Sequence, residues 1–256
     1  YEEVGDKLIK GICGQVDGSV IPGMIGLEAG QSSFGDVYAM FRRVLEFPVK
    51  NILPKTLAGK LTEEEIQAAV DEISDRIIAE LTVEAEKIPL EESTMIATDW
   101  INGRRTPDAN QLLQGTISGF TLGTTAPQIF RALVEATAFG TKAIVDRFIS
   151  EGCPIESVIG IGGIALKSPF VMQTMSDVLG MPIKVCKTDQ ACALGASMFA
   201  ATAAGVYQKV EDAIAAMNSG FAKEYQPDMQ RHDRYASLYE TYLKLGSFTE
   251  KELYVC

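Results

Sequence analysis

The segment from Gly160 to Pro169, Gly-Ile-Gly-Gly-Ile-Ala-Leu-Lys-Ser-Pro, holds the residues whose types and spacing most clearly suggest chemistry. It follows a short apolar run that favours a strand. Gly162 and Gly163 would let a ligand approach the backbone, and a helix N-terminus behind them would favour an anion. Ser168 and Pro169 suit the N-cap and the first helical position. This layout is typical of a nucleotide pocket, although tight strand-to-helix packing explains the glycines alone equally well.

Two further stretches carry polar groups that could meet a ligand. Glu28 stands just before Ala29 and Gly30, where its carboxylate could accept hydrogen bonds from hydroxyl groups. The loop over residues 99–108 contains Asp99, Asn102, Arg104 and Arg105. These side chains could face a cleft, or they could surround a turn built on Asn102-Gly103.

Composition narrows the class of protein. The 256 residues carry a formal charge of −11, which argues against a broad nucleic-acid surface. No apolar run approaches the ~18–20 residues of a membrane helix. The five cysteines form no C-x-x-C pair, and His232 is the single histidine, so a zinc site and a Ser-His-Asp triad are both disfavoured. Scattered cysteines suit reduced thiols in a cytoplasm.

The elements that must position these residues can be read from periodicity and caps. We expect a β-meander over residues 7–29, with a hairpin turn at Asp17-Gly18 and a strand from Met24 to Leu27. A helix opened by Ser33 should end at Pro48. Thr62 and Glu65 form a capping box for a helix that runs to about Lys87.

The second half of the chain alternates helices and strands, which fits one α/β domain. A helix from Thr125 should end near Gly152, and Gly180 should stop the helix that follows Pro169. The remaining expected elements are strands at 95–97, 158–161 and 183–186 and helices at 190–204 and 233–252.

Taken together, these motifs resemble those of the FGGY carbohydrate kinases, in the actin/hexokinase/Hsp70-like superfamily. Segments 162–168, 176–180 and 193–197 resemble that family's adenosine motif. Segment 115–135, which includes the string at 128–135, partly matches its C-terminal signature, from which Leu133 departs. The ribulokinase branch is the most similar, over essentially the whole chain, through the strings at residues 11–14, 21–23, 28–32, 99–103 and 131–140.

The resemblance implies an α/β fold of the actin-like ATPase (ribonuclease H-like) type, with a mixed sheet flanked by helices. Residues 1–256 would form the C-terminal, nucleotide-binding domain. The N-terminal domain, with the catalytic base, is expected upstream of Tyr1, so this chain should hold no catalytic residue and no metal ligand. The implied reaction transfers the γ-phosphoryl group of ATP, with Mg²⁺, to a ketopentose hydroxyl. L-ribulose, from L-arabinose catabolism, is the favoured substrate.

The same resemblance assigns roles to single residues. Gly30, Phe34, Gly162, Gly163 and Lys167 would bind the nucleotide. Core packing is the alternative for Phe34, and Lys167 would either hydrogen-bond the adenine or turn outward.

Glu28 would bind the sugar, and Ser168 would cap a helix. The implied partners are ATP or ADP, a ketopentose and the N-terminal domain of the same protein, with no nucleic acid and no membrane. The location would be cytoplasmic, and a homodimer is left open. Two alternatives remain: a kinase of the same family acting on xylulose, glycerol or another polyol, and a non-catalytic actin-like nucleotide-binding module.

Overall fold

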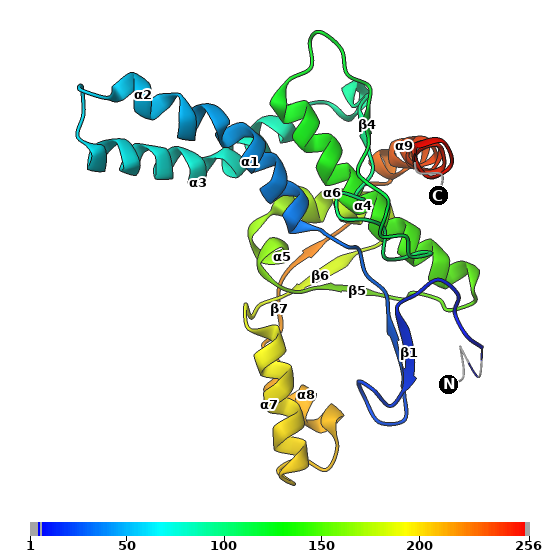
Figure 1. Cartoon of the computed structure of the whole chain (residues 1–256). Coiled ribbons are helices and arrows are strands. Elements are labelled where there is room, and N and C mark those ends of the chain that lie inside the picture. The colour runs from blue at the N-terminus through cyan, green and yellow to red at the C-terminus, as the bar shows by residue number, and fades with distance from the viewer. Residues whose placement is uncertain (1–4, 6, 254–256) are drawn as a thin grey trace. The chain divides into compact units, whose positions relative to one another are not determined.

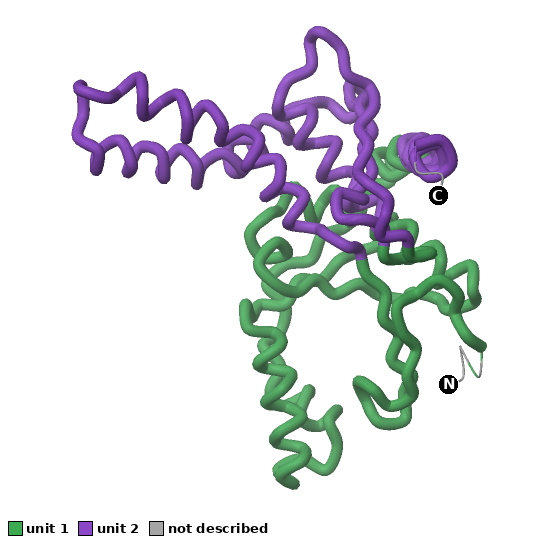
Figure 2. Tube along the Cα trace, viewed as in Figure 1, with its two compact units in different colours: residues 1–30, 105–109, 141–236 green, residues 31–104, 110–140, 237–256 purple. Residues whose placement is uncertain are grey.

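The chain forms two compact units in a computed structural model that describes Gly5 and residues 7–253 (Figure 2). Each unit gathers three separate stretches of the chain. Unit 1 comprises residues 1–30, 105–109 and 141–236, and unit 2 comprises residues 31–104, 110–140 and 237–256. The long helices α4 (Ala126–Ser150) and α9 (Met229–Phe248) contribute residues to both units.

The main sheet of unit 1 consists of β5 (Val158–Gly160), β6 (Ile183–Cys186) and β7 (Phe221–Tyr225), in that order (Figure 1). β5 and β6 run parallel, whereas β6 and β7 run antiparallel, so the expected mixed sheet is confirmed. β7 was not expected from the sequence, because only Tyr225 of its five residues is buried and no apolar alternation marks it.

Helices flank this sheet: α5 (Gly163–Lys167), α6 (Pro169–Leu179), α7 (Ala191–Ala203) and α8 (Val210–Met217). Gly180 ends α6 in the left-handed conformation, with φ of 66°, as predicted. Ser168 occupies the N-cap position of α6 and Pro169 the first helical position, as predicted, but the expected side-chain cap does not form. The Ser168 amide donates to the carbonyl of Ile164 at 3.0 Å, and the Ser168 side chain makes no capping hydrogen bond.

A separate antiparallel hairpin in unit 1 joins β1 (Gly14–Asp17) to β2 (Ile25–Glu28). The expected tight turn at Asp17-Gly18 is wrong, since Asp17 pairs with Ile25 and the connection spans residues 18–24. Burial explains this register: Val20, in the stretch expected to pair, is 61% exposed, whereas the apolar residues of β2 are half-buried.

Unit 2 begins with a helical arm made of α1 (Gly35–Asn51), α2 (Leu53–Leu57) and α3 (Glu63–Lys87), in which α1 packs against α3 (Figure 1). The capping box of α3 is confirmed. The Glu65 amide donates to Thr62 Oγ1 at 3.2 Å, and the Thr62 amide donates to Glu65 Oε2 at 2.9 Å. Pro48 does not end α1, because it removes only one donor and the helix resumes its hydrogen bonds beyond it, from Ile52 to the Pro48 carbonyl.

The core of unit 2 surrounds the first half of α4, in which every residue from Phe130 to Gly140 is buried. Thr125 and Gln128 start this helix as predicted, through a 2.8 Å bond from the Thr125 amide to Gln128 Oε1. The small elements of the unit are the 3₁₀ turn Leu90–Glu92, the two-stranded pair β3 (Ile96–Ala97) and β4 (Ile117–Ser118), and the π-helical turn Thr249–Leu253.

The last helix, α9, begins earlier than the expected Asp233. Asp228 Oδ1 accepts hydrogen bonds from the amides of Gln230 and Arg231, at 2.9 and 3.2 Å, which is the pattern of an N-terminal helix cap. Inside unit 2, Tyr239 and Tyr242 of α9 stack on each other with ring centroids 5.9 Å apart, and both contact Phe139. The C-terminal part of α9 therefore closes the aromatic core of unit 2.

Candidate nucleotide and sugar site

The glycine turn of unit 1 lies at the carboxyl end of β5, beside the parallel strand β6. Ligands of open α/β sheets bind at this edge. Gly162 has φ of 87° and ψ of −179°, a backbone conformation that only glycine adopts readily. A side chain added at Gly162 or Gly163 would meet nothing within 4 Å. The backbone of both residues is therefore open to a ligand.

The structure distinguishes two interpretations of this turn, tight packing and anion binding at a helix N-terminus. Gly160 serves packing, because a Cβ there would stand 3.0 Å from the Met172 Cε. The helix behind the turn is α5, of only five residues, so no long helix dipole stands there to attract an anion. Backbone N–H groups, rather than a helix end, are what the turn can offer to a nucleotide.

Gly30 has the same open character. A Cβ at Gly30 would meet nothing within 4 Å, and the Gly30 amide donates to Thr106 Oγ1 at 3.3 Å. Thr106 Oγ1 also lies 3.2 Å from the Cys13 thiol. The hydroxyl of this buried threonine thus joins the residues after β2 to the segment before β1.

Glu28, the last residue of β2, projects a carboxylate whose side chain is 67% exposed. Its Oε1 atom accepts a hydrogen bond from Arg105 Nη2 at 2.7 Å. Arg105 also donates from Nε to the Cys13 thiol at 3.1 Å. The candidate sugar-binding residue is therefore held by an arginine that lies 77 positions further along the chain.

Of the remaining predicted nucleotide residues, Phe34 belongs to unit 2. Its ring makes an edge contact with Tyr38, with centroids 6.1 Å apart, and Tyr38 contacts Phe130 in turn. These contacts support the packing alternative for Phe34. Lys167 ends α5 with an exposed side chain, which favours the outward orientation. Nucleotide contacts of both residues remain predictions.

The loop over residues 99–108 is divided by the structure. Asp99 is buried in unit 2, where Gln31 Nε2 donates to its Oδ2 at 2.8 Å and the Tyr242 hydroxyl donates to its Oδ1 at 2.7 Å. Burial raises the pKa of the Asp99 carboxyl and holds the pKa of Tyr242 well above its usual value. Asp99 is therefore part of the core.

The middle of the loop is a turn, as the structural alternative expected. The Gly103 amide donates to the Trp100 carbonyl at 3.1 Å, and Gly103 has φ of 78°. Arg104 lies over the Trp100 ring at 4.9 Å and binds both carboxylate oxygens of Glu250, at 2.9 and 2.7 Å. Arg104 thus stabilises unit 2, and only its neighbour Arg105 reaches Glu28.

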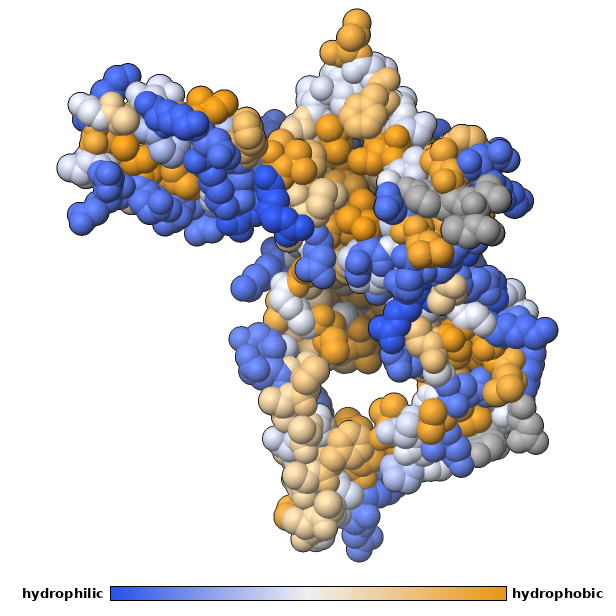
Figure 3. Space-filling view, viewed as in Figure 1, coloured by the Kyte–Doolittle hydropathy of each residue, from blue (hydrophilic) through white to orange (hydrophobic). Residues whose placement is uncertain are grey.

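Unit 1 also contains an apolar hollow of about 470 Å³ that sequence reasoning missed. Its lining includes Ile161, immediately before the glycine turn, and apolar residues from the sheet, α7 and α8: Ile159, Met198, Ile214 and Phe221. Figure 3 shows apolar surface along α7, whose residues other than Met198 are at least partly exposed. The sequence does carry one signal for this surface, the run of small residues in α7.

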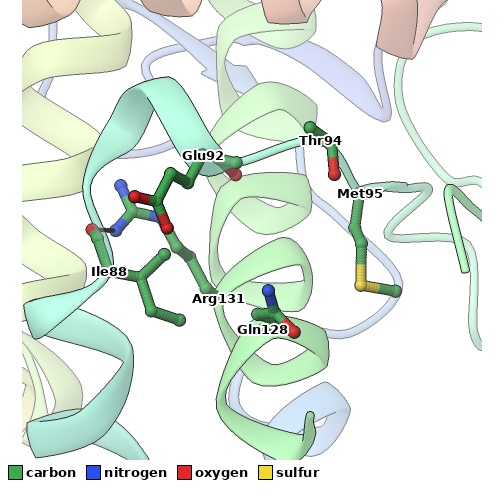
Figure 4. A pocket seen from close by; sticks show the side chains of 7 residues that line it. Ile88, Glu92, Thr94, Met95, Gln128 and Arg131 are labelled. Atoms are coloured by element: carbon green, nitrogen blue, oxygen red, sulfur yellow. Dashed lines mark hydrogen bonds between the residues drawn. The ribbon is translucent and has the colours of Figure 1, made fainter. Parts of the chain in front are cut away.

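A much smaller pocket, of about 10 Å³, lies beside α4 in unit 2 and has room for about one water molecule. Figure 4 shows the Arg131 guanidinium pointing to the carbonyl of Ile88, to which it donates. Arg131 Nε also donates to Glu135 Oε1 at 2.8 Å. This part of the expected family signature builds the core of unit 2.

Over Gly5 and residues 7–253, we find no helix that combines sustained apolarity with the length needed to span a bilayer. Within the same residues no group of three or more His, Cys, Asp or Glu side chains is placed to hold a metal ion. His232 contacts the Asp177 carbonyl through Nδ1 at 2.9 Å and lies against Gly180, which is a structural role in unit 1.

A mixed sheet flanked by helices, with open glycine backbone after β5 and after the separate hairpin strand β2, defines an α/β protein whose glycines leave room for a ligand. Residues 4–204 match the model of the FGGY family of carbohydrate kinases, C-terminal domain, and the chain belongs to this family. It is 47% identical to the ribulokinase of Vibrio parahaemolyticus over 98% of its own length. It is 36% identical to the ribulokinase of Bacillus licheniformis over 96% of its length. The chain spans 43% and 42% of these two relatives.

Solved structures of sugar kinases share the fold. The xylulose kinase of Rhodospirillum rubrum matches with a TM-score of 0.65 and 21% identity, over 90% of this chain and 42% of that one. A kinase from Brucella ovis matches with a TM-score of 0.64 and 17% identity, over 86% of this chain and 38% of that one. At such low identity these similarities establish the fold alone, which is the expected actin-like ATPase fold.

Proposed function

We propose that this chain is the C-terminal, nucleotide-binding part of an ATP-dependent kinase that phosphorylates L-ribulose. The observation that carries the proposal is the similarity of nearly the whole chain to ribulokinases from several organisms, at 47% identity in one of them. The position of Glu28, exposed beside an open glycine, supports a sugar-binding role for this carboxylate.

The residues present fit a nucleotide. Gly30, Gly162 and Gly163 each leave empty the space that a side chain would fill, so a ligand could contact their backbone. ATP supplies the phosphoryl group when it is bound, and Mg²⁺ would neutralise charge on its phosphates. We assign no metal ligand among the described residues.

The catalytic base and the opposite wall of the cleft belong, in this proposal, to an N-terminal domain of the same protein. We therefore expect the chain alone to transfer no phosphoryl group at a meaningful rate, because positioning and deprotonation of the sugar hydroxyl need that domain. A cytoplasmic location belongs to the same proposal, since ATP is an intracellular substrate. A homodimer remains a prediction.

The test is a substrate panel on the complete protein that carries this chain. With ATP and Mg²⁺ it should convert L-ribulose to L-ribulose 5-phosphate with a higher kcat/KM than for xylulose or glycerol. A preference for xylulose or glycerol would assign it to another branch of the family. Nucleotide binding without phosphorylation of any sugar would indicate a non-catalytic module and overturn the proposal.

A further inference from the structure

Four residues of unit 1 form a connected polar group at the end of β2, which we call the Glu28 cluster: Cys13, Glu28, Arg105 and Thr106. Its centre is the Arg105 guanidinium, which donates to Glu28 Oε1 at 2.7 Å and to the Cys13 thiol at 3.1 Å. The guanidinium is therefore held at two points. Thr106, the next residue, binds the Gly30 amide and fixes the backbone beside it.

An isolated exposed ion pair contributes little to stability. The pair of Glu28 and Arg105 is open to solvent, since their side chains are 67% and 49% exposed, respectively. We therefore look for a role of this ion pair in orienting the Glu28 carboxylate and not in stabilising the fold. A glutamate with three free torsions loses rotamer freedom when a ligand fixes it, and this entropy loss weakens binding. Arg105 reduces that loss, because the carboxylate is already oriented.

The different surroundings of the two carboxylate oxygens of Glu28 also favour a role for Arg105 in orienting this side chain. Arg105 occupies Oε1 of Glu28, and no residue that the structure describes donates a hydrogen bond to Oε2. A carboxylate can accept several hydrogen bonds, so Oε2 remains available to hydroxyl groups of a ligand. Because Nε of Arg105 is hydrogen-bonded to the Cys13 thiol, the rigid guanidinium presents Nη2 to Oε1 in a fixed direction, which the flexible ammonium of a lysine would not do.

We propose that Arg105 is a positioning residue for sugar binding, which acts by holding Glu28 so that Oε2 faces the substrate hydroxyls. The proposal rests on the proposed function. It adds to it the residue that determines how well the carboxylate is oriented. Arg105 itself need not touch the sugar.

The test compares variants of the complete protein in steady-state kinetics with L-ribulose and ATP. We expect Arg105→Gln to raise the KM for the sugar about tenfold, with kcat and the KM for ATP unchanged, because only binding of the hydroxyls is affected. Arg105→Lys should recover part of the loss. The matched control is Arg76→Gln, which breaks an exposed 2.8 Å pair with Glu80 on α3 and should leave both KM values unchanged.

A double-mutant cycle decides whether Arg105 acts through Glu28. In a Glu28→Gln background, Arg105→Gln should have no further effect on the KM for the sugar. Equal effects in both backgrounds would overturn the proposal, as would an unchanged KM in the single variant. If the parent protein phosphorylates L-ribulose but neither single variant changes its KM, the proposed function stands and the role of the cluster is refuted. If the parent phosphorylates no sugar, both fall together.

Discussion

Arg131 and Glu135 lie one turn apart on α4 and form an ion pair in which both side chains are almost completely buried, 3% and 1% exposed. The pair does not stand alone. Arg131 donates to the carbonyls of Ala85 and Ile88 at the end of α3, and Ser93 donates to Glu135 Oε2 at 2.9 Å. The pair thus connects α4 to the segment that follows α3 within unit 2.

We predict that Glu135→Gln lowers the free energy of unfolding by about 3–5 kcal/mol, because it leaves the Arg131 charge buried and uncompensated. Urea unfolding of the complete protein measures this change. Glu80→Gln is the control, since it breaks an exposed pair and should change stability by less than about 1 kcal/mol. Equal losses in the two variants would show that burial of the pair is not what matters.

Two glycines inside helices should respond to the same substitution with opposite signs. A Cβ at Gly140 of α4 would stand 2.2 Å from Asp99 Oδ2, so we expect Gly140→Ala to lower stability by about 1–3 kcal/mol. A Cβ at Gly195 of α7 would meet nothing within 4 Å, so Gly195→Ala should raise stability by about 0.5–1 kcal/mol. Thermal unfolding midpoints compare them: a raised midpoint in Gly140→Ala would contradict the close contact with Asp99, and a lowered midpoint in Gly195→Ala would contradict the open space at Gly195.

The glycine turn offers a test that separates folding from binding. Gly162→Ala should lower stability by about 1–3 kcal/mol, because alanine is strained at φ of 87° and ψ of −179°. Gly163→Ala should leave stability almost unchanged but weaken ATP binding, since a methyl group would occupy the space open to the ligand. Calorimetric titration with ATP measures the affinity. Full affinity in Gly163→Ala would remove this residue from the nucleotide pocket.

Asp99 should give unit 2 a specific pH dependence. Burial raises the pKa of Asp99 in the folded protein above its unfolded value of about 3.9. Between these two values the folded state binds more protons than the unfolded state, so this residue's contribution to stability falls as the pH rises through that window. Asp99→Asn cannot titrate, so the stability of the parent relative to this variant should be greatest at acid pH and decrease as the pH increases.

Urea unfolding at a series of pH values measures this difference. The control is Asp75→Asn, which changes a carboxylate whose side chain is 79% exposed. The free energy of unfolding of this variant should change with pH in the same way as that of the parent. A constant difference between the parent and Asp99→Asn at every pH would mean that Asp99 has the same pKa in both states.

Local signals account for what could be predicted of the fold. The capping box at Thr62 and Glu65 and the αL glycine at Gly180 lie within one turn of the helix ends that they determine, so both were readable from the sequence. β7 was not, because a strand with one buried residue is selected by its pairing with β6 and not by its own pattern. Pro48 shows the same limit, since packing of α1 on α3 outweighs the local signal.

In the candidate site, too, some residues could be predicted from the sequence and others could not. Gly162 and Glu28 could be proposed from their types and neighbours in the sequence. The partner of Glu28 could not, because Arg105 and Arg104 are chemically identical neighbours and only the folded chain directs one to Glu28 and the other to Glu250. Asp99 looked equally polar, and its burial beside Tyr242 could not be inferred from a loop sequence.

The position of β5 has a consequence for handling the protein. Among the described residues β5 pairs only with β6, and Ile159 and Ile161, which line the apolar hollow of unit 1, are each 54% exposed. A bare strand edge with apolar side chains is a template on which another chain can add a strand. We expect concentrated solutions of this chain to lose solubility through edge-to-edge association, and a lysine in place of Ile159 to restore it. Sedimentation at increasing protein concentration would measure this association. The highest concentration at which the protein can be handled would then depend on the exposed edge of β5.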